Sequence, residues 1–167
     1  MKLSLYTLPQ VPLEAETISP GLLLGKSASE VEALPVFHGN NEMKLGDFFT
    51  VTPRPGNDTV EVEGDLSKVK LLGNAMSSGR LIIHGNVGAH LGAGMTGGEI
   101  IVEGNAADWA GREMSGGHII IKGNAGHMLG SAVRGATVGM LGGEILVHGS
   151  AGNEIGHGMR RGLIAIG

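Results

Sequence analysis

The chain has 167 residues, enough for one ordinary domain, with 41% hydrophobic residues, 17% charged residues and a net charge of −4. It has no basic field for nucleic acid, no cysteine for disulfides or iron–sulfur ligation, and no apolar run near the roughly 18 residues of a membrane span. The first ten residues lack the pattern of a signal peptide. We therefore expect a cytoplasmic protein that binds neither nucleic acid nor membranes.

Residues 1–55 hold all six prolines and most of the aromatic residues, which predicts an N-terminal arm or cap. Within them, residues 27–34 begin with serine, carry an acidic first turn and stop at Pro35, as a short helix does. Residues 45–51 are predicted to form a strand that enters the body of the protein.

Residues 56–167 are predicted to form glycine-rich repeats. A degenerate first turn around residues 60–65 precedes four copies of a 19-residue phrase, and a fifth copy stops within its first strand. The copies begin at Met76, Met95, Met114, Met140 and Met159. Self-similarity at a fixed short period is the signature of a solenoid.

Three apolar columns appear when the repeats are aligned, and they predict parallel strands stacked about 4.8 Å apart. The first column holds Leu81, Ile100, Ile119, Ile145 and Ile164; the second Ile82, Ile101, Ile120, Leu146 and Ala165; the third Ile83, Val102, Ile121, Val147 and Ile166. The predicted fold is all-β: a right-handed parallel β-helix with turns of about 19 residues and an irregular N-terminal cap containing a short helix.

Glycine columns on both sides of the strand are interpreted as corners. The earlier column holds Gly79, Gly98, Gly117, Gly143 and Gly162, and the later column holds Gly85, Gly104, Gly123 and Gly149. Glycine permits positive φ and close stacking of backbones. Asn86, Asn105 and Asn124 follow the later corner, where asparagine tolerates the left-handed region and stacked amides can bond along the column.

No catalytic, cofactor-binding or metal-binding residue is predicted. His84 and His148 share a charged column, but Glu103 and Lys122 lie between them, and the other histidines lack ligand spacing. Nucleophile-elbow, P-loop and dinucleotide-binding motifs are missing. A glycine loop that recurs in every repeat is interpreted as scaffold.

Two features that depart from the repeat pattern are predicted to form the interface with a partner. Residues 131–139 add seven residues to one turn and carry Arg134, which is either a projecting contact or the solvated tip of a loop. If the first and third columns fill the interior, Ile82, Ile101, Ile120 and Leu146 form an outward apolar stripe. We expect a partner, or the N-terminal segment itself, to cover this stripe.

The glycine phrase resembles the C-terminal β-helical domain of the large chain of glutamate synthase. A closer resemblance, to the family of the C subunit of formylmethanofuran dehydrogenase, spans nearly the whole chain. It rests on the phrases at residues 12–15, 18–20, 25–27, 38–40 and 45–49, and on Arg134-Gly135 ahead of Gly139-Met140.

This resemblance implies a non-catalytic scaffold subunit of a hetero-oligomer, in one of two assemblies. One is the archaeal dehydrogenase, which makes formylmethanofuran from CO2 and carries molybdopterin or tungstopterin in its partner subunits. The other is the bacterial formyltransferase/hydrolase complex, which residues 91–95 and 159–164 resemble somewhat.

Three alternatives are weaker. A stand-alone glutamate synthase module, acting as scaffold of an amidotransferase, would lack the N-terminal phrases. A hexapeptide acyltransferase needs a period of six, and a calcium-binding solenoid needs an aspartate in each repeat, where only Asp108 occurs.

The end of the chain departs from the family pattern. Members continue for several more turns, whereas this sequence ends at Gly167, one residue short of the expected corner glycine. Either the chain is a shortened relative whose last strand is covered by a partner, or it is truncated at its C-terminus, in which case the unpaired backbone groups predict self-association through that end.

Overall fold

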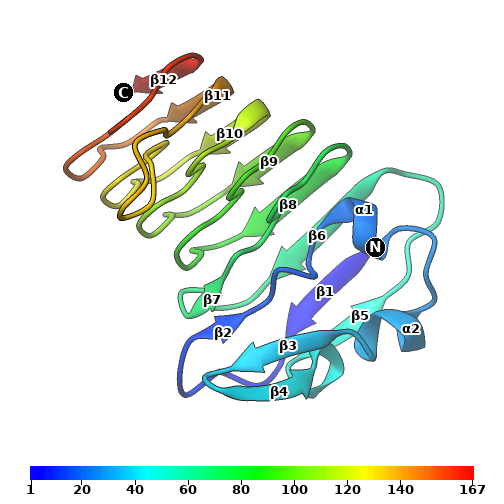
Figure 1. Ribbon diagram of the computed structural model, residues 1–167. Coiled ribbons are helices and arrows are strands. Elements are labelled where there is room, and N and C mark those ends of the chain that lie inside the picture. The colour runs from blue at the N-terminus through cyan, green and yellow to red at the C-terminus, as the bar shows by residue number, and fades with distance from the viewer.

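A computed structural model describes residues 1–167 (Figure 1). The N-terminal elements are β1 (Lys2–Leu5), β2 (Leu13–Glu14), α1 (Pro20–Leu23), α2 (Ala28–Glu32), β3 (Pro35–His38), β4 (Asn41–Lys44), the 3-10 helix η1 (Leu45–Asp47) and β5 (Phe49–Thr52). The repeats contribute β6 (Thr59–Glu63), β7 (Val69–Lys70), β8 (Arg80–His84), β9 (Glu99–Val102), β10 (Ser115–Ile121), β11 (Gly142–Val147) and β12 (Leu163–Ile166). None of the helices has the length and hydropathy needed to cross a bilayer.

The predicted register of the repeat strands is confirmed. Strands β6, β8, β9, β10, β11 and β12 pair in parallel, one after another. Leu81 lies beside Ile100, and Ile82 lies beside Ile101, as the aligned columns predict. Val60 of β6 pairs with Leu81, so the degenerate first turn is also in register.

From β8 to β11 the first and third columns point into the core, as predicted for a strand whose side chains alternate between two faces, whereas in β12 Ile164 is partly exposed and Ile166 is 43% exposed. Ile100, Ile119 and Ile145 are fully buried, and Val147 is only 2% exposed. Burial of each large aliphatic side chain contributes roughly 1.5–3 kcal/mol. This core continues without a break into the N-terminal segment, where it includes Leu3 and other side chains. The division at residue 55 into an arm and a repeat region stays a prediction.

The N-terminal segment extends both sheets. β1 pairs in parallel with β6 and antiparallel with β5, which protects the edge of β6. The predicted short helix is confirmed as α2, because the Ser27 N–H donates to the Glu30 carboxylate at 2.7 Å and the Glu30 N–H donates to Ser27 Oγ. The predicted strand over residues 45–51 is wrong in its first half. There the Asp47 carboxylate accepts a hydrogen bond from the Lys44 N–H at 2.9 Å and closes η1 instead.

The predicted all-β, right-handed parallel β-helix with 19-residue turns is not supported. The strands lie in two sheets, one of eight strands in the order β12-β11-β10-β9-β8-β6-β1-β5 and one of four in the order β4-β3-β2-β7, accompanied by short helices. Each later repeat contributes one strand, and its remaining residues form turns joined to the next repeat by single bridges such as Ala106 to Ala125. The glycine-rich turns contain too few residues in extended conformation to form another sheet. The N-terminal segment, predicted as an irregular cap, supplies strands to both sheets.

The two glycine columns differ in why they need glycine. Glycines of the earlier column have positive φ, for example +85° at Gly117. In the later column only Gly85 does, at +127°, and Gly104, Gly123 and Gly149 do not. A Cβ on Gly104 would lie 2.6 Å from the Gly85 carbonyl oxygen, so close stacking of the backbones excludes a side chain there.

The asparagine column bonds to the backbone rather than amide to amide. Asn86 Oδ1 accepts a hydrogen bond from the Asn105 N–H at 2.9 Å, and Asn105 Oδ1 accepts one from the Asn124 N–H at 2.7 Å. Asn124 Oδ1 accepts from Ser150. These side chains therefore link successive repeats.

Candidate functional site

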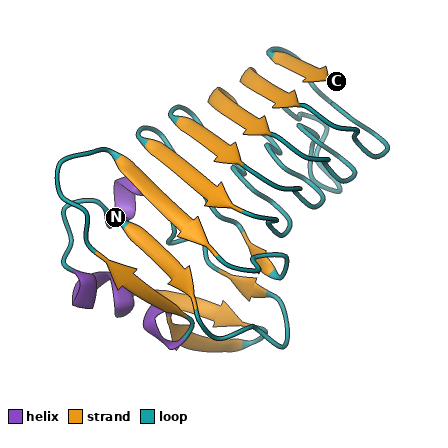
Figure 2. Cartoon of the chain, turned by 180° about the vertical axis from the view of Figure 1, so that it is seen from behind, coloured by secondary structure: helices purple, strands orange, loops and turns teal.

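The second apolar column lies on the outer face of the eight-stranded sheet. Ile82, Ile101, Ile120 and Leu146 are partly exposed and stand side by side on four successive strands. We call these four residues the aliphatic stripe. No segment of the N-terminal region lies across it (Figure 2), so the expectation that this region covers the stripe is wrong. Cover by a partner stays a prediction.

Paired charges border the stripe at the start of the strands. Arg80 Nε lies 2.6 Å from the Glu99 carboxylate, and His118 Nδ1 lies 3.2 Å from the Glu144 carboxylate. These contacts join neighbouring strands, as the alternation of charges in the sequence predicts. The charges on this side therefore have partners within the chain.

A second charged ladder borders the stripe at the end of the strands. The His84 ring lies between Glu61, at 3.1 Å from Nε2, and Glu103, at 2.8 Å from Nδ1; Lys122 lies 3.6 Å from Glu103. The hydrogen bond to Glu103, aided by Glu61, raises the pKa of His84 against the opposing effect of burial. The same hydrogen bond lowers the pKa of Glu103. Nowhere in the chain do three His, Cys, Asp or Glu side chains converge closely enough to hold a metal ion.

The insertion lies on the opposite side of the repeats, over their turns (Figure 1). Met140 N–H donates to the Gly130 carbonyl at 3.0 Å, which joins the two ends of the loop and lets the repeat resume as if uninterrupted. Ala132 N–H donates to the His157 carbonyl at 2.9 Å. Arg134 is exposed and makes no ion pair or hydrogen bond within the chain. The structure thus separates Arg134 from the aliphatic stripe.

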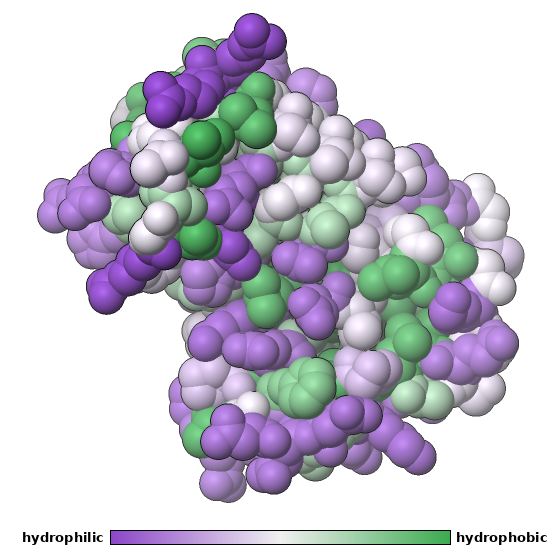
Figure 3. Space-filling model, viewed as in Figure 1, coloured by the Kyte–Doolittle hydropathy of each residue, from purple (hydrophilic) through white to green (hydrophobic).

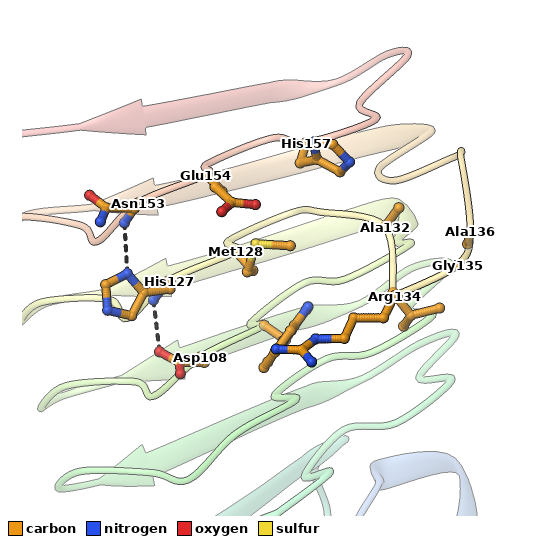
Figure 4. Close-up of a pocket in the computed structure, with 12 residues that line it drawn as sticks. Asp108, His127, Met128, Ala132, Arg134, Gly135, Ala136, Asn153, Glu154 and His157 are labelled. Carbon is orange, nitrogen blue, oxygen red and sulfur yellow. Dashed lines mark hydrogen bonds between the residues drawn. The ribbon is translucent and has the colours of Figure 1, made fainter.

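A cavity of about 510 Å³ lies between the insertion and the turns of three repeats. Its lining residues are Asp108, Trp109, His127, Met128, Ala132, Val133, Arg134, Gly135, Ala136, Asn153, Glu154 and His157 (Figure 4). Sequence reasoning identified the insertion and Arg134 but missed the rest of this lining. The face around the cavity mixes hydrophobic and hydrophilic residues (Figure 3).

A column of residues with a left-handed backbone conformation runs beneath the insertion. Because none of these residues is a glycine, the conformation could not be recognised from the sequence. Leu71, His90, Trp109, Met128 and Glu154 have φ between 57° and 66°. The rings of His90 and Trp109 stack with centroids 5.4 Å apart. His90 Nδ1 and Trp109 Nε1 are buried without a hydrogen-bond partner. Burial, followed by the nearby Arg112 and Lys70, lowers the pKa of His90.

Comparison with known proteins bears on this architecture. Over 84 residues the chain is 49% identical to the C subunit of the molybdenum-containing formylmethanofuran dehydrogenase 1 of Methanothermobacter thermautotrophicus, covering 50% of this chain and 21% of that protein. The C subunit of the tungsten-containing enzyme 2 from the same organism is 47% identical over 88 residues, covering 50% and 33%. Over this half of its length, the chain is similar to C subunits of formylmethanofuran dehydrogenases. The resemblance inferred from the sequence phrases is confirmed.

A solved structure extends the similarity to the whole chain. A chain in the crystal structure of the formyltransferase/hydrolase complex from Methylorubrum extorquens, in complex with methylofuran, matches with a TM-score of 0.84 and 29% identity. The match covers 99% of this chain and 76% of that one. No protein-family model matches. The chain spans only about a fifth to a third of the length of the curated relatives it matches.

Proposed function

We propose that this chain is a structural, non-catalytic subunit of a one-carbon complex that handles formyl groups, and that it holds the catalytic subunits in position. The observation that carries the proposal is the match of 99% of the chain to a chain of an assembled formyltransferase/hydrolase complex. The sequence relatives are subunits of formylmethanofuran dehydrogenases, which favours this role over an amidotransferase scaffold of the glutamate synthase type.

The aliphatic stripe is the proposed contact with a catalytic subunit. Ile82, Ile101, Ile120 and Leu146 form a continuous apolar path, and the charges beside it already have partners within the chain. A partner can cover the path without leaving those charges unpaired, which keeps the cost of desolvation low. Contiguous apolar surface of this kind marks interaction sites in soluble proteins. Arg134 lies on the other face and does not belong to this contact.

The proposed structural role of this chain is the same in the dehydrogenase and in the formyltransferase/hydrolase complex. In both, the proposed role leaves chemistry, including any molybdopterin or tungstopterin, to the partner subunits. A rigid stack of hydrogen-bonded strands suits this role because it presents contact residues at fixed spacing. The cytoplasmic location expected from the sequence stays a prediction.

The test is assembly of the complex from co-expressed subunits, measured by native mass spectrometry. Ile101→Glu and Ile120→Glu should each abolish incorporation of this chain, because a charge would be buried in the contact. Leu22→Glu is the matched control, since Leu22 is 49% exposed and lies outside the stripe.

Two outcomes would contradict the proposal. Normal incorporation of both isoleucine variants would remove the stripe as the contact. Turnover of a formylated furan carrier by the purified chain alone would show that the chain is catalytic.

A further inference from the structure

The cavity under the insertion has the size and construction of a small-molecule site. Its volume of about 510 Å³ lies within the roughly 300–1,000 Å³ of ligand pockets. The insertion forms one wall and turns of consecutive repeats form the floor (Figure 4). Because the ends of the insertion are hydrogen-bonded to the repeats, this wall is held in place.

Hydrogen bonds also fix the polar residues of the floor. Asp108 Oδ1 accepts from the His127 N–H at 2.8 Å, and His127 Nδ1 accepts from the Asn153 N–H at 2.9 Å. His127 Nδ1 is therefore an acceptor, which leaves the proton of the neutral ring on Nε2. Side chains held in this way are preorganised for a ligand.

The floor keeps bulky side chains at strained positions. Trp109, Met128 and Glu154 have φ of 60°, 60° and 57°, where a residue other than glycine costs about 1–2 kcal/mol. Two residues further along each turn the same region of φ is occupied by glycine, as at Gly111 and Gly130. The same conformation recurs at Leu71 and His90 outside the cavity, so it is a property of the repeat that aligns these side chains in one column.

The charges of the lining are separated and unpaired. Arg134 comes from the insertion, whereas Asp108 and Glu154 come from two different turns, and all three border the same space (Figure 4). No nitrogen of Arg134 lies within 4.0 Å of a carboxylate oxygen, and the Glu154 carboxylate makes no hydrogen bond. One cation faces two carboxylates, so Arg134, Asp108 and Glu154 together carry a single negative charge.

We propose that this cavity binds a free basic amino acid. The carboxylate of the ligand pairs with the guanidinium of Arg134, whose fork geometry matches it. The two ammonium groups of a ligand such as lysine pair with Asp108 and Glu154, so that the ligand and the lining have opposite net charge. The methylene chain lies against Trp109 and Met128, as the stems of charged side chains do on apolar surfaces.

The test measures binding of three related probes to the full chain by isothermal titration calorimetry. L-Lysine carries all three charges, L-norleucine lacks the side-chain cation and cadaverine lacks the carboxylate. L-Lysine should bind saturably, and each of the other two should bind about tenfold more weakly or worse, since each loses one charge-assisted contact, and a tenfold loss corresponds to about 1.4 kcal/mol. This site does not depend on the proposed complex, so the isolated chain is sufficient.

Variants connect the binding to this cavity. Arg134→Met should weaken L-lysine about tenfold and leave cadaverine unchanged, because cadaverine has no carboxylate. Glu154→Gln should weaken both. Arg161→Met is the matched control, since Arg161 is exposed, has no ion pair and lies outside the cavity, and it should change neither.

Three results would overturn the proposal. They are no saturable binding of L-lysine, equal binding of all three probes, and binding that survives both Arg134→Met and Glu154→Gln. Circular dichroism of each variant shows whether the fold is intact, and because Arg134 and Glu154 are both exposed we expect no change.

Discussion

The two faces of the repeats are stabilised differently, although every repeat contributes a strand to one face and a turn to the other. On the sheet face, the strands are in register and the flanking charges pair between neighbouring strands, as Arg80 does with Glu99. On the turn face, the insertion breaks the repeat, and the charged groups of Arg134 and Glu154 have no partner within the chain. A regular face satisfies its own polar groups, so its recognition surface is the apolar stripe. An irregular face leaves polar groups free for a ligand.

The largest expected effect on stability distinguishes the buried side of one strand from its exposed side. Ile119 is fully buried in the core, and its neighbour Ile120 lies partly exposed in the aliphatic stripe. Ile119→Ala should lower the free energy of unfolding by about 2–5 kcal/mol, because it leaves a cavity in a packed core. Ile120→Ala should cost less than about 1 kcal/mol, since only part of the side chain leaves a buried environment. Urea denaturation of the two variants measures the difference, and equal losses would contradict the assignment of the faces.

The next effect tests the stacking of the corners. Gly123→Ala should lower the free energy of unfolding by about 1–3 kcal/mol, since its Cβ would lie 2.6 Å from the Gly104 carbonyl oxygen. Gly21→Ala is the control, because nothing lies within 4 Å of its Cβ and its φ is not positive. That variant should be neutral or slightly stabilising. A stable Gly123→Ala protein in thermal denaturation would show that the corners can separate.

A smaller effect depends on pH and on the charged ladder of the sheet face. Glu103 and Glu61 raise the pKa of His84 above 6.5, so the pairing stabilises the fold fully below pH 6.5 and is lost as pH rises through the raised value. His84→Gln should therefore destabilise at acidic pH and have little effect at alkaline pH. The difference should stay below about 1 kcal/mol, because the His84 side chain is 35% exposed and solvent screens the pair. Unfolding free energies of both proteins across this range measure it, and a difference that grows with pH would contradict the pairing.

The smallest expected effect on stability comes from removing the insertion. Deletion of residues 132–138 leaves Gly130-Ser131-Gly139-Met140, which has the spacing of Gly92-Ala93-Gly94-Met95 in the regular repeat. The free energy of unfolding should change by less than about 1 kcal/mol, because loop closure depends weakly on length. The cavity and its binding of L-lysine should be lost. A protein that fails to fold would show that the insertion supports the stack.

Sequence reasoning succeeded where a local rule determines the structure. The alternation of strand side chains placed Ile119 inside and Ile120 outside, and the serine–glutamate spacing marked α2. It failed where the outcome depends on partners distant in the chain. The pairing of β1 with both β5 and β6, which incorporates the N-terminal segment into the sheet, has no local signature.

The cavity, too, could be predicted from the sequence only in part. The insertion is visible as a break in the period, but its floor is built from Asp108, His127 and Asn153, which lie in separate repeats and align only when the repeats stack. The left-handed backbone at Trp109 and Met128 was hidden because neither residue is a glycine.

By itself, the sequence determined the period, the register of the repeat strands and the residues of the aliphatic stripe, because each follows from side-chain alternation repeated at fixed spacing. Only the tertiary structure decided that the strands lie in two sheets, that the N-terminal segment leaves the stripe uncovered, and that Arg134 borders a cavity on the opposite face. These features depend on which distant segments pack together, and that is set by the total burial and hydrogen bonding of the folded chain.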